Sequence, residues 1–79
     1  MTEIQELEKA VDNFALHMKK RLRTKYQEGY RGWKTRYPTD KLMLKASEDT
    51  VKILTGHSIK KHCIDVANRM MMIWFRHIV

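Results

Sequence analysis

The stretch KKHCIDVANRMMMIWF, Lys60–Phe75, decides the fold, because it is apolar on two faces and carries a single carboxylate, Asp65. Residues spaced three and four apart form a first apolar stripe: Ile59, Cys63, Val66, Met70 and Ile73. A second stripe runs beside the first: Ile64, Ala67, Met71, Trp74 and Ile78. This spacing predicts an α-helix over residues 59–78, with Ser58 as its N-cap. A helix with two apolar faces is buried on both, so we expect it at the centre of the fold.

The second apolar face of this helix also predicts an oligomer. A chain of 79 residues builds only a small core and is often stabilised by association. We therefore expect a homodimer or a higher oligomer, in which a second subunit covers one side of the helix. The predicted oligomer interface consists of Met70, Met71, Trp74 and Ile78.

Two further helices are expected upstream. In residues 3–26 an apolar stripe runs from Ile4 to Met18, and Thr2 with Gln5 matches a capping box. Residues 27–39 contain two glycines and Pro38 and predict a loop. Residues 40–54 form the next predicted helix, with Thr39 or Asp40 as its cap and Gly56 as its stop. The expectation is an all-α single domain of three helices, with the last two antiparallel and the bundle completed by dimerisation.

Composition and charge narrow the classes of function. The net charge is +7, which predicts an anionic partner such as nucleic acid, a nucleotide or an acidic protein surface. One cysteine excludes a disulfide scaffold and favours a reducing compartment. The longest apolar run, Met70–Phe75, is too short to cross a bilayer, and no secretory signal is recognised. We therefore predict a cytoplasmic protein without a membrane partner.

A basic and aromatic segment extends from the end of the first helix into the loop. Its cations are Lys19, Lys20, Arg21, Arg23, Lys25, Arg31, Lys34 and Arg36. Its aromatic residues are Tyr26, Tyr30, Trp33 and Tyr37. Cations contact phosphates and aromatic rings stack on bases, so this segment predicts a nucleic-acid or other anion-binding surface. The alternative is that the charges are solvated and that Trp33 packs the loop onto the bundle.

Three acidic residues lie on the antiparallel helix pair. Glu48 and Asp49 are adjacent on the second helix, and Asp65 lies on the third. Converging carboxylates are suited to Mg²⁺, which takes oxygen ligands. In the alternative interpretation, Glu48 and Asp49 are a solvated face and Asp65 pairs with Lys61 or Arg69 one turn away. The histidines and Cys63 match no zinc-site spacing, so no zinc site is predicted.

Three features within about residues 27–73 carry a resemblance to a known family: EGYRGW, the paired acids Glu48 and Asp49, and DVANRMMM. Together they resemble the small phage-type members of the MazG-like nucleotide pyrophosphohydrolases. The resemblance implies an all-α fold whose EExxE and ExxD motifs hold Mg²⁺, which activates water to release pyrophosphate from a nucleoside triphosphate. Residue by residue, Glu48 and Asp49 take the first two acidic positions and Lys52 the third. His62 takes the glutamate position of the second motif and Asp65 its aspartate, and Asn68 lies where the family often has an asparagine near the phosphates.

Lys52 and His62 stand at two of the five expected acidic positions and indicate a degenerate site. An ammonium group repels a divalent cation, and imidazole is a poor ligand for Mg²⁺. We predict that Lys52 pairs with Asp65 or Glu48 in place of the metal, and that no cofactor is bound. Mg²⁺ held by Glu48, Asp49 and Asp65 is expected only if the chain is active.

Three hypotheses for function follow. The first is a non-catalytic interaction protein on a MazG-like scaffold, encoded by a phage, which binds and modulates a host macromolecule, foremost a host protein. The second is a Mg²⁺-dependent nucleoside triphosphate pyrophosphohydrolase with an altered site. The third is a nucleic-acid-binding protein that uses the basic segment 19–36.

Overall fold

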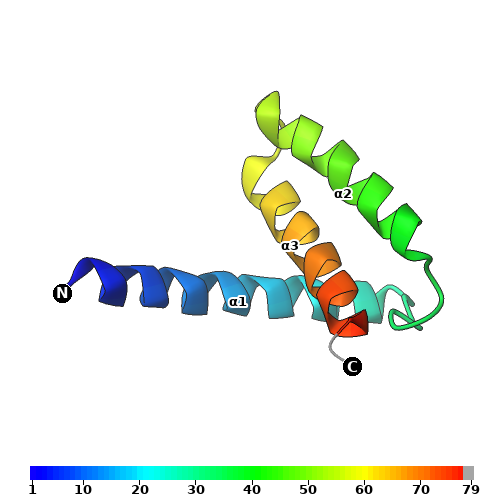
Figure 1. Cartoon of the computed structure of the whole chain (residues 1–79), viewed down its shortest axis with the longest axis horizontal. Helices are drawn as coiled ribbons and strands as arrows, with labels where there is room; N and C mark the ends of the chain where they lie inside the picture. Colours follow the sequence, from blue (N-terminus) through cyan, green and yellow to red (C-terminus); the bar gives the residue numbers. More distant parts are fainter. Residues whose placement is uncertain (78–79) are drawn as a thin grey trace.

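The computed structural model describes residues 1–77, and in that part of the chain three helices and no strand are found (Figure 1). The helices are α1 (Glu3–Gln27), α2 (Thr39–Leu54) and α3 (Ile59–Arg76). The predicted all-α class is confirmed, and the starts and ends of α1 and α2 differ from the prediction by at most one residue. The predicted third helix is too long, because α3 ends at Arg76 with His77 as its C-cap. Ile78 lies outside the described residues.

The caps of the helices follow the sequence at α1 and depart from it at α2 and α3. Thr2 Oγ1 accepts a hydrogen bond from the Gln5 amide at 3.3 Å, and Gln5 Oε1 accepts one from the Thr2 amide at 2.9 Å, which confirms the capping box. At α2, Pro38 occupies the N-cap position without a side-chain hydrogen bond. The predicted cap by Thr39 or Asp40 is therefore wrong, since Thr39 already lies in the first turn.

The turn between α2 and α3 explains why Ser58 does not cap α3. Gly56 has φ +80°, and the His57 amide donates to the Lys52 carbonyl at 2.9 Å, which closes α2 as a Schellman motif. This confirms Gly56 as the stop. The chain then reverses within residues 55–58, and Ser58 adopts a left-handed conformation with φ 46° and no side-chain cap bond. The Ser58 hydroxyl therefore does not accept the capping hydrogen bond that the sequence predicts, because the tight reversal holds the Ser58 backbone in the left-handed region.

The central position of α3 agrees with the prediction. α3 lies antiparallel to α2 and crosses the carboxyl-terminal half of α1, while the amino-terminal half of α1 projects away from the other two helices (Figure 1). Asn68 Nδ2 donates to the Met18 carbonyl at 3.3 Å and joins α3 to α1. Within residues 1–77, none of the helices is long and apolar enough to cross a membrane.

The apolar core of a single chain is small. Among the described residues, Leu42 and Ala46 on the inner face of α2 are the buried apolar side chains. The apolar residues of α3 are half-buried or exposed, and its buried residues are the polar His62 and Asn68. The contact between α2 and α3 thus combines the apolar Leu42 and Ala46 with the polar Asp49 and His62, and buried polar groups of this kind need hydrogen-bond or ionic partners.

Candidate functional site

A polar cluster lies where α2 packs against α3. Leu42, Ala46 and Asp49 share the inner face of α2, because they are spaced four and three residues apart. The same spacing on α3 turns three side chains toward α1 and α2: His62, Asp65 and Arg69. Asp49 and His62 are buried, while Asp65 and Arg69 are half-buried. The fold therefore brings two carboxylates together in a largely dehydrated place.

Each carboxylate of the cluster is paired with an arginine. Arg21 Nε on α1 donates to Asp65 Oδ1 at 3.0 Å. Arg69 Nη1 on α3 donates to Asp49 Oδ2, and His62 Nδ1 lies 3.4 Å from Asp49 Oδ1. Two guanidinium groups thus balance two carboxylates, since Arg21 faces Asp65 and Arg69 faces Asp49.

The expectation that a protein cation pairs with Asp65 holds, but the partner is neither Lys52, Lys61 nor Arg69. It is Arg21, which lies 44 residues away in the sequence. Spacing along one helix could not reveal this pair, because it depends on where α1 crosses α3.

Two predicted members of the acidic site lie outside the cluster. Glu48 is exposed on the outer side of α2, where its carboxylate lies 3.7 Å from Lys45 Nζ. Lys52 is also exposed and makes neither of its predicted ion pairs among the described residues. Successive helical residues are rotated by about 100°, so Glu48 cannot share the inward direction of its neighbour Asp49. Asn68 lies one turn after Asp65, with its amide directed at α1.

The residues of the cluster fit Mg²⁺ poorly. Ligand atoms of Asp49, His62 and Asp65 lie within 4.8 Å of one another, so these groups are close enough to share an ion. Mg²⁺, however, prefers six oxygen ligands, and this set contributes one nitrogen. Both carboxylates also face arginines, which any cation would have to displace at a cost in free energy. No catalytic step through a metal is therefore derived for this cluster.

A cavity of about 800 Å³ opens beside the cluster and is bounded by the end of α1, the loop 28–38 and the faces of α2 and α3. Its basic lining residues are Arg21, Arg23, Lys25, Arg31, Lys41, Lys45 and Arg69. Its aromatic lining residues are Tyr26, Tyr30, Trp33 and Tyr37. The one acidic residue in the lining is Asp65, which is paired with Arg21. The cavity thus offers positive charge and aromatic faces to a ligand.

Half of the eight cations predicted from the sequence line this cavity. Arg21, Arg23, Lys25 and Arg31 line it, whereas Lys19, Lys20, Lys34 and Arg36 do not. Sequence reasoning missed three others: Lys41, Lys45 and Arg69. The signal that could have found the first two is their spacing of four residues, which places both on one face of α2.

The loop 28–38 is held in place by its aromatic and basic side chains. Trp33 packs edge-on against Phe75 of α3 at 5.0 Å between ring centroids, and Arg76 Nη2 donates to the Trp33 carbonyl at 2.8 Å. The interpretation of Trp33 as a residue that packs the loop onto the bundle is therefore supported. The guanidinium carbon of Arg31 lies 3.4 Å from the ring centroid of Tyr26, in a cation–π contact. The loop is a structured wall of the cavity.

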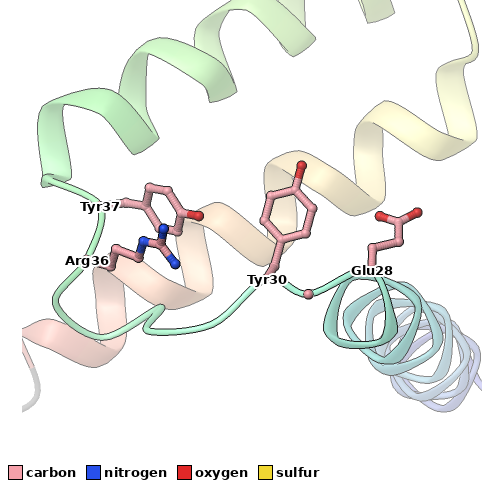
Figure 2. Close-up of a pocket in the computed structure, with 5 residues that line it drawn as sticks. Glu28, Tyr30, Arg36 and Tyr37 are labelled. Carbon is pink, nitrogen blue, oxygen red and sulfur yellow. The ribbon is translucent and has the colours of Figure 1, made fainter.

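A second, smaller cavity of about 300 Å³ lies on the loop itself. Figure 2 shows Glu28 at the end of α1, Tyr30 further along the loop, and Arg36 and Tyr37 where the loop approaches α2. Tyr30 and Tyr37 line both cavities. The smaller cavity is thus a side compartment of the same basic and aromatic surface.

The predicted oligomer interface is only partly accessible in one chain. Met70 and Met71 are half-buried, and Met71 lines the larger cavity. Trp74 is exposed, and Ile78 lies outside the described residues. Association through α3 stays a prediction.

Comparison of the chain with protein-family models, curated proteins and solved structures found no match. The resemblance to MazG-like proteins therefore rests on the motifs of the sequence. The function must be argued from the polar cluster and the adjoining cavity.

Proposed function

We propose that this chain is a non-catalytic binding protein on a MazG-like helical scaffold, and that it binds an anionic group of a macromolecular partner. The observation that carries the proposal is the pairing of both clustered carboxylates with arginines, Asp65 with Arg21 and Asp49 with Arg69. In the resembled family these positions face a magnesium ion. Here the positive charge comes from the chain itself.

The charge balance of the cluster supports this proposal. Asp49 and Asp65 contribute two negative charges, and Arg21 and Arg69 contribute two positive charges. A divalent cation is attracted to a site by uncompensated negative charge, which this cluster lacks. Glu48, a predicted third carboxylate, points outward and pairs with Lys45. Activation of water by a metal, which the pyrophosphohydrolase reaction needs, therefore has little support.

The cavity beside the cluster is the proposed binding surface. Seven cations and four aromatic residues line it. Four of these cations are paired with carboxylates of the chain, and Arg23, Arg31 and Lys41 make no ion pair among the described residues. Such a surface attracts carboxylate or phosphate groups and holds planar groups by stacking. The resemblance to small phage-type proteins supports a host partner in the host cytoplasm, first of all a host protein with an acidic surface, which the chain would modulate.

The first test is an assay for pyrophosphate release. We expect the wild-type protein, incubated with a panel of nucleoside triphosphates and either Mg²⁺ or Mn²⁺, to release no more pyrophosphate than a blank without protein. The reason is that the arginine-paired carboxylates leave the metal without its ligands. Turnover by the wild type that is lost in Asp49→Asn would instead favour the altered pyrophosphohydrolase. Circular dichroism of both proteins controls for folding.

A second candidate function, nucleic-acid binding, is favoured by the aromatic lining of the cavity. Tyr26, Tyr30, Trp33 and Tyr37 lie among cations from α1, the loop and α2. Phosphate contacts supply affinity without sequence preference, and aromatic faces stack on unpaired bases. A single strand is a better fit than a duplex, since only unpaired bases expose their faces to side chains.

The salt dependence of oligonucleotide binding tests this second candidate. If about four phosphates are neutralised, raising the salt from about 50 to about 200 mM lowers the affinity for single-stranded RNA or DNA roughly 50-fold. Fluorescence anisotropy of a labelled oligonucleotide measures this change. Arg31→Ala and Lys41→Ala should each weaken binding, whereas Lys60→Ala, on an exposed residue outside the cavity lining, should not. Absence of binding at low salt would exclude nucleic acid and leave the acidic protein partner.

A further inference from the structure

The amino-terminal half of α1 exposes an apolar surface that the rest of the chain does not cover. Ile4, Leu7, Val11 and Phe14 are 61%, 57%, 65% and 40% exposed. These four residues, here named the α1 stripe, lie on the part of α1 that projects away from α2 and α3 (Figure 1). Their spacing of three, four and three residues keeps them on one side of the helix. An apolar stripe of this length on a projecting helix marks an interaction surface.

The surface area of the chain indicates that a large interface is missing. One chain exposes 6473 Å², whereas a compact monomer of its mass exposes only about 5,000 Å². The excess of roughly 1,400 Å² is more than the ~800 Å² per partner that a stable protein interface buries. A second copy of the chain can account for this excess, because both copies then bury the same surface.

We propose that two copies of this chain associate through the α1 stripe. The stripe has the alternating spacing of the a and d positions of a heptad repeat, beginning with Ile4 at a and Leu7 at d and continuing through Val11 and Phe14. Met18 extends the same pattern to the place where α1 meets α3. The paired helices thus continue the core of each subunit across the two-fold axis.

The α1 stripe is a better interface than the end of α3. Of the residues predicted there, Trp74 is exposed, while Met70 and Met71 are half-buried by their own chain. The stripe instead offers four exposed apolar residues over eleven positions of one helix. This inference is independent of the proposed binding function, because no stripe residue lines either cavity.

Sedimentation equilibrium of the full chain tests the interface. We expect the wild type to be a dimer at micromolar concentration, and Leu7→Glu/Val11→Glu to raise the dimer dissociation constant at least 100-fold. Leu7→Ala/Val11→Ala keeps good helix formers at both positions and should raise it at least tenfold, which separates loss of the interface from loss of the helix. The matched control is Val51→Glu/Leu54→Glu on the exposed face of α2, which should remain a dimer. Circular dichroism of each variant monitors helix content.

Several outcomes would overturn the proposal. A wild-type monomer at high micromolar concentration contradicts it outright. Dissociation by Trp74→Glu with no effect of the stripe variants would assign the interface to α3, and dissociation by the control would assign it to α2.

Discussion

Asp49→Ala is expected to lower the free energy of unfolding by about 3 kcal/mol or more. The carboxylate of Asp49 is buried between α2 and α3, where Arg69 pairs with one oxygen and His62 Nδ1 lies 3.4 Å from the other. Its removal leaves a half-buried guanidinium without a counter-charge. In a domain of this size, a loss of that magnitude lowers the melting temperature by roughly 12–24 °C. Thermal unfolding followed by circular dichroism, at one fixed protein concentration, measures the effect.

The neighbouring residue provides the matched control. Glu48 is exposed and pairs only with Lys45 across the surface, so Glu48→Ala should change the stability by less than about 0.5 kcal/mol. The double variant Asp49→Leu/Arg69→Met removes both charges and should recover much of the loss, since an apolar pair avoids the cost of dehydrating ions. Equal effects of Asp49→Ala and Glu48→Ala would show that the buried pair does not hold α2 to α3.

Leu42→Ala is expected to destabilise the chain by about 2–3 kcal/mol. Leu42 is 8% exposed and, with Ala46, makes up the buried apolar contact of α2 with the rest of the described chain. Truncation removes several buried methylene and methyl groups and leaves a cavity that the backbone cannot fully close. Urea unfolding at fixed protein concentration gives the change in free energy from the shift in the midpoint.

Leu44→Ala serves as the control for Leu42→Ala, because it is the same substitution two positions along the same helix. Leu44 is 61% exposed, so its truncation should cost less than about 0.5 kcal/mol. A comparable loss in both variants would mean that the outer face of α2 is also covered in solution. In that case the oligomer would bury α2, contrary to the interface on α1.

The helices themselves could be predicted from local sequence, because apolar periodicity and strong stop signals act over a few residues. Thr2 with Gln5 fixed the start of α1, and Gly56 fixed the end of α2. The cap at Ser58 could not be foreseen, since its left-handed backbone arises from a reversal that involves the ends of two helices. Likewise, Pro38 took the N-cap position that the polar residues after it were expected to hold.

The sequence predicted which residues of α2 and α3 form the polar cluster better than it predicted which cations pair with their carboxylates. Of the residues grouped by sequence, Asp49, His62 and Asp65 lie together in the folded chain, and Asn68 donates to the Met18 carbonyl of α1. The outward directions of Glu48 and Lys52 follow from the rotation of α2 about its axis, which a linear motif does not specify. The role of Arg21 depends on the crossing point of α1 and α3, and only the folded chain shows it.

The turn between α2 and α3 is only four residues long, over positions 55–58. Contacts between α2 and α3 close a short loop, and short loops cost little entropy and form quickly. The contacts that attach α1, Arg21 with Asp65 and Asn68 with Met18, instead join positions 44 and 50 residues apart. We therefore expect the α2–α3 hairpin to form first and α1 to dock last. By the same reasoning we expect α1 to detach first on unfolding. Its detachment separates the guanidinium of Arg21 from the carboxylate of Asp65.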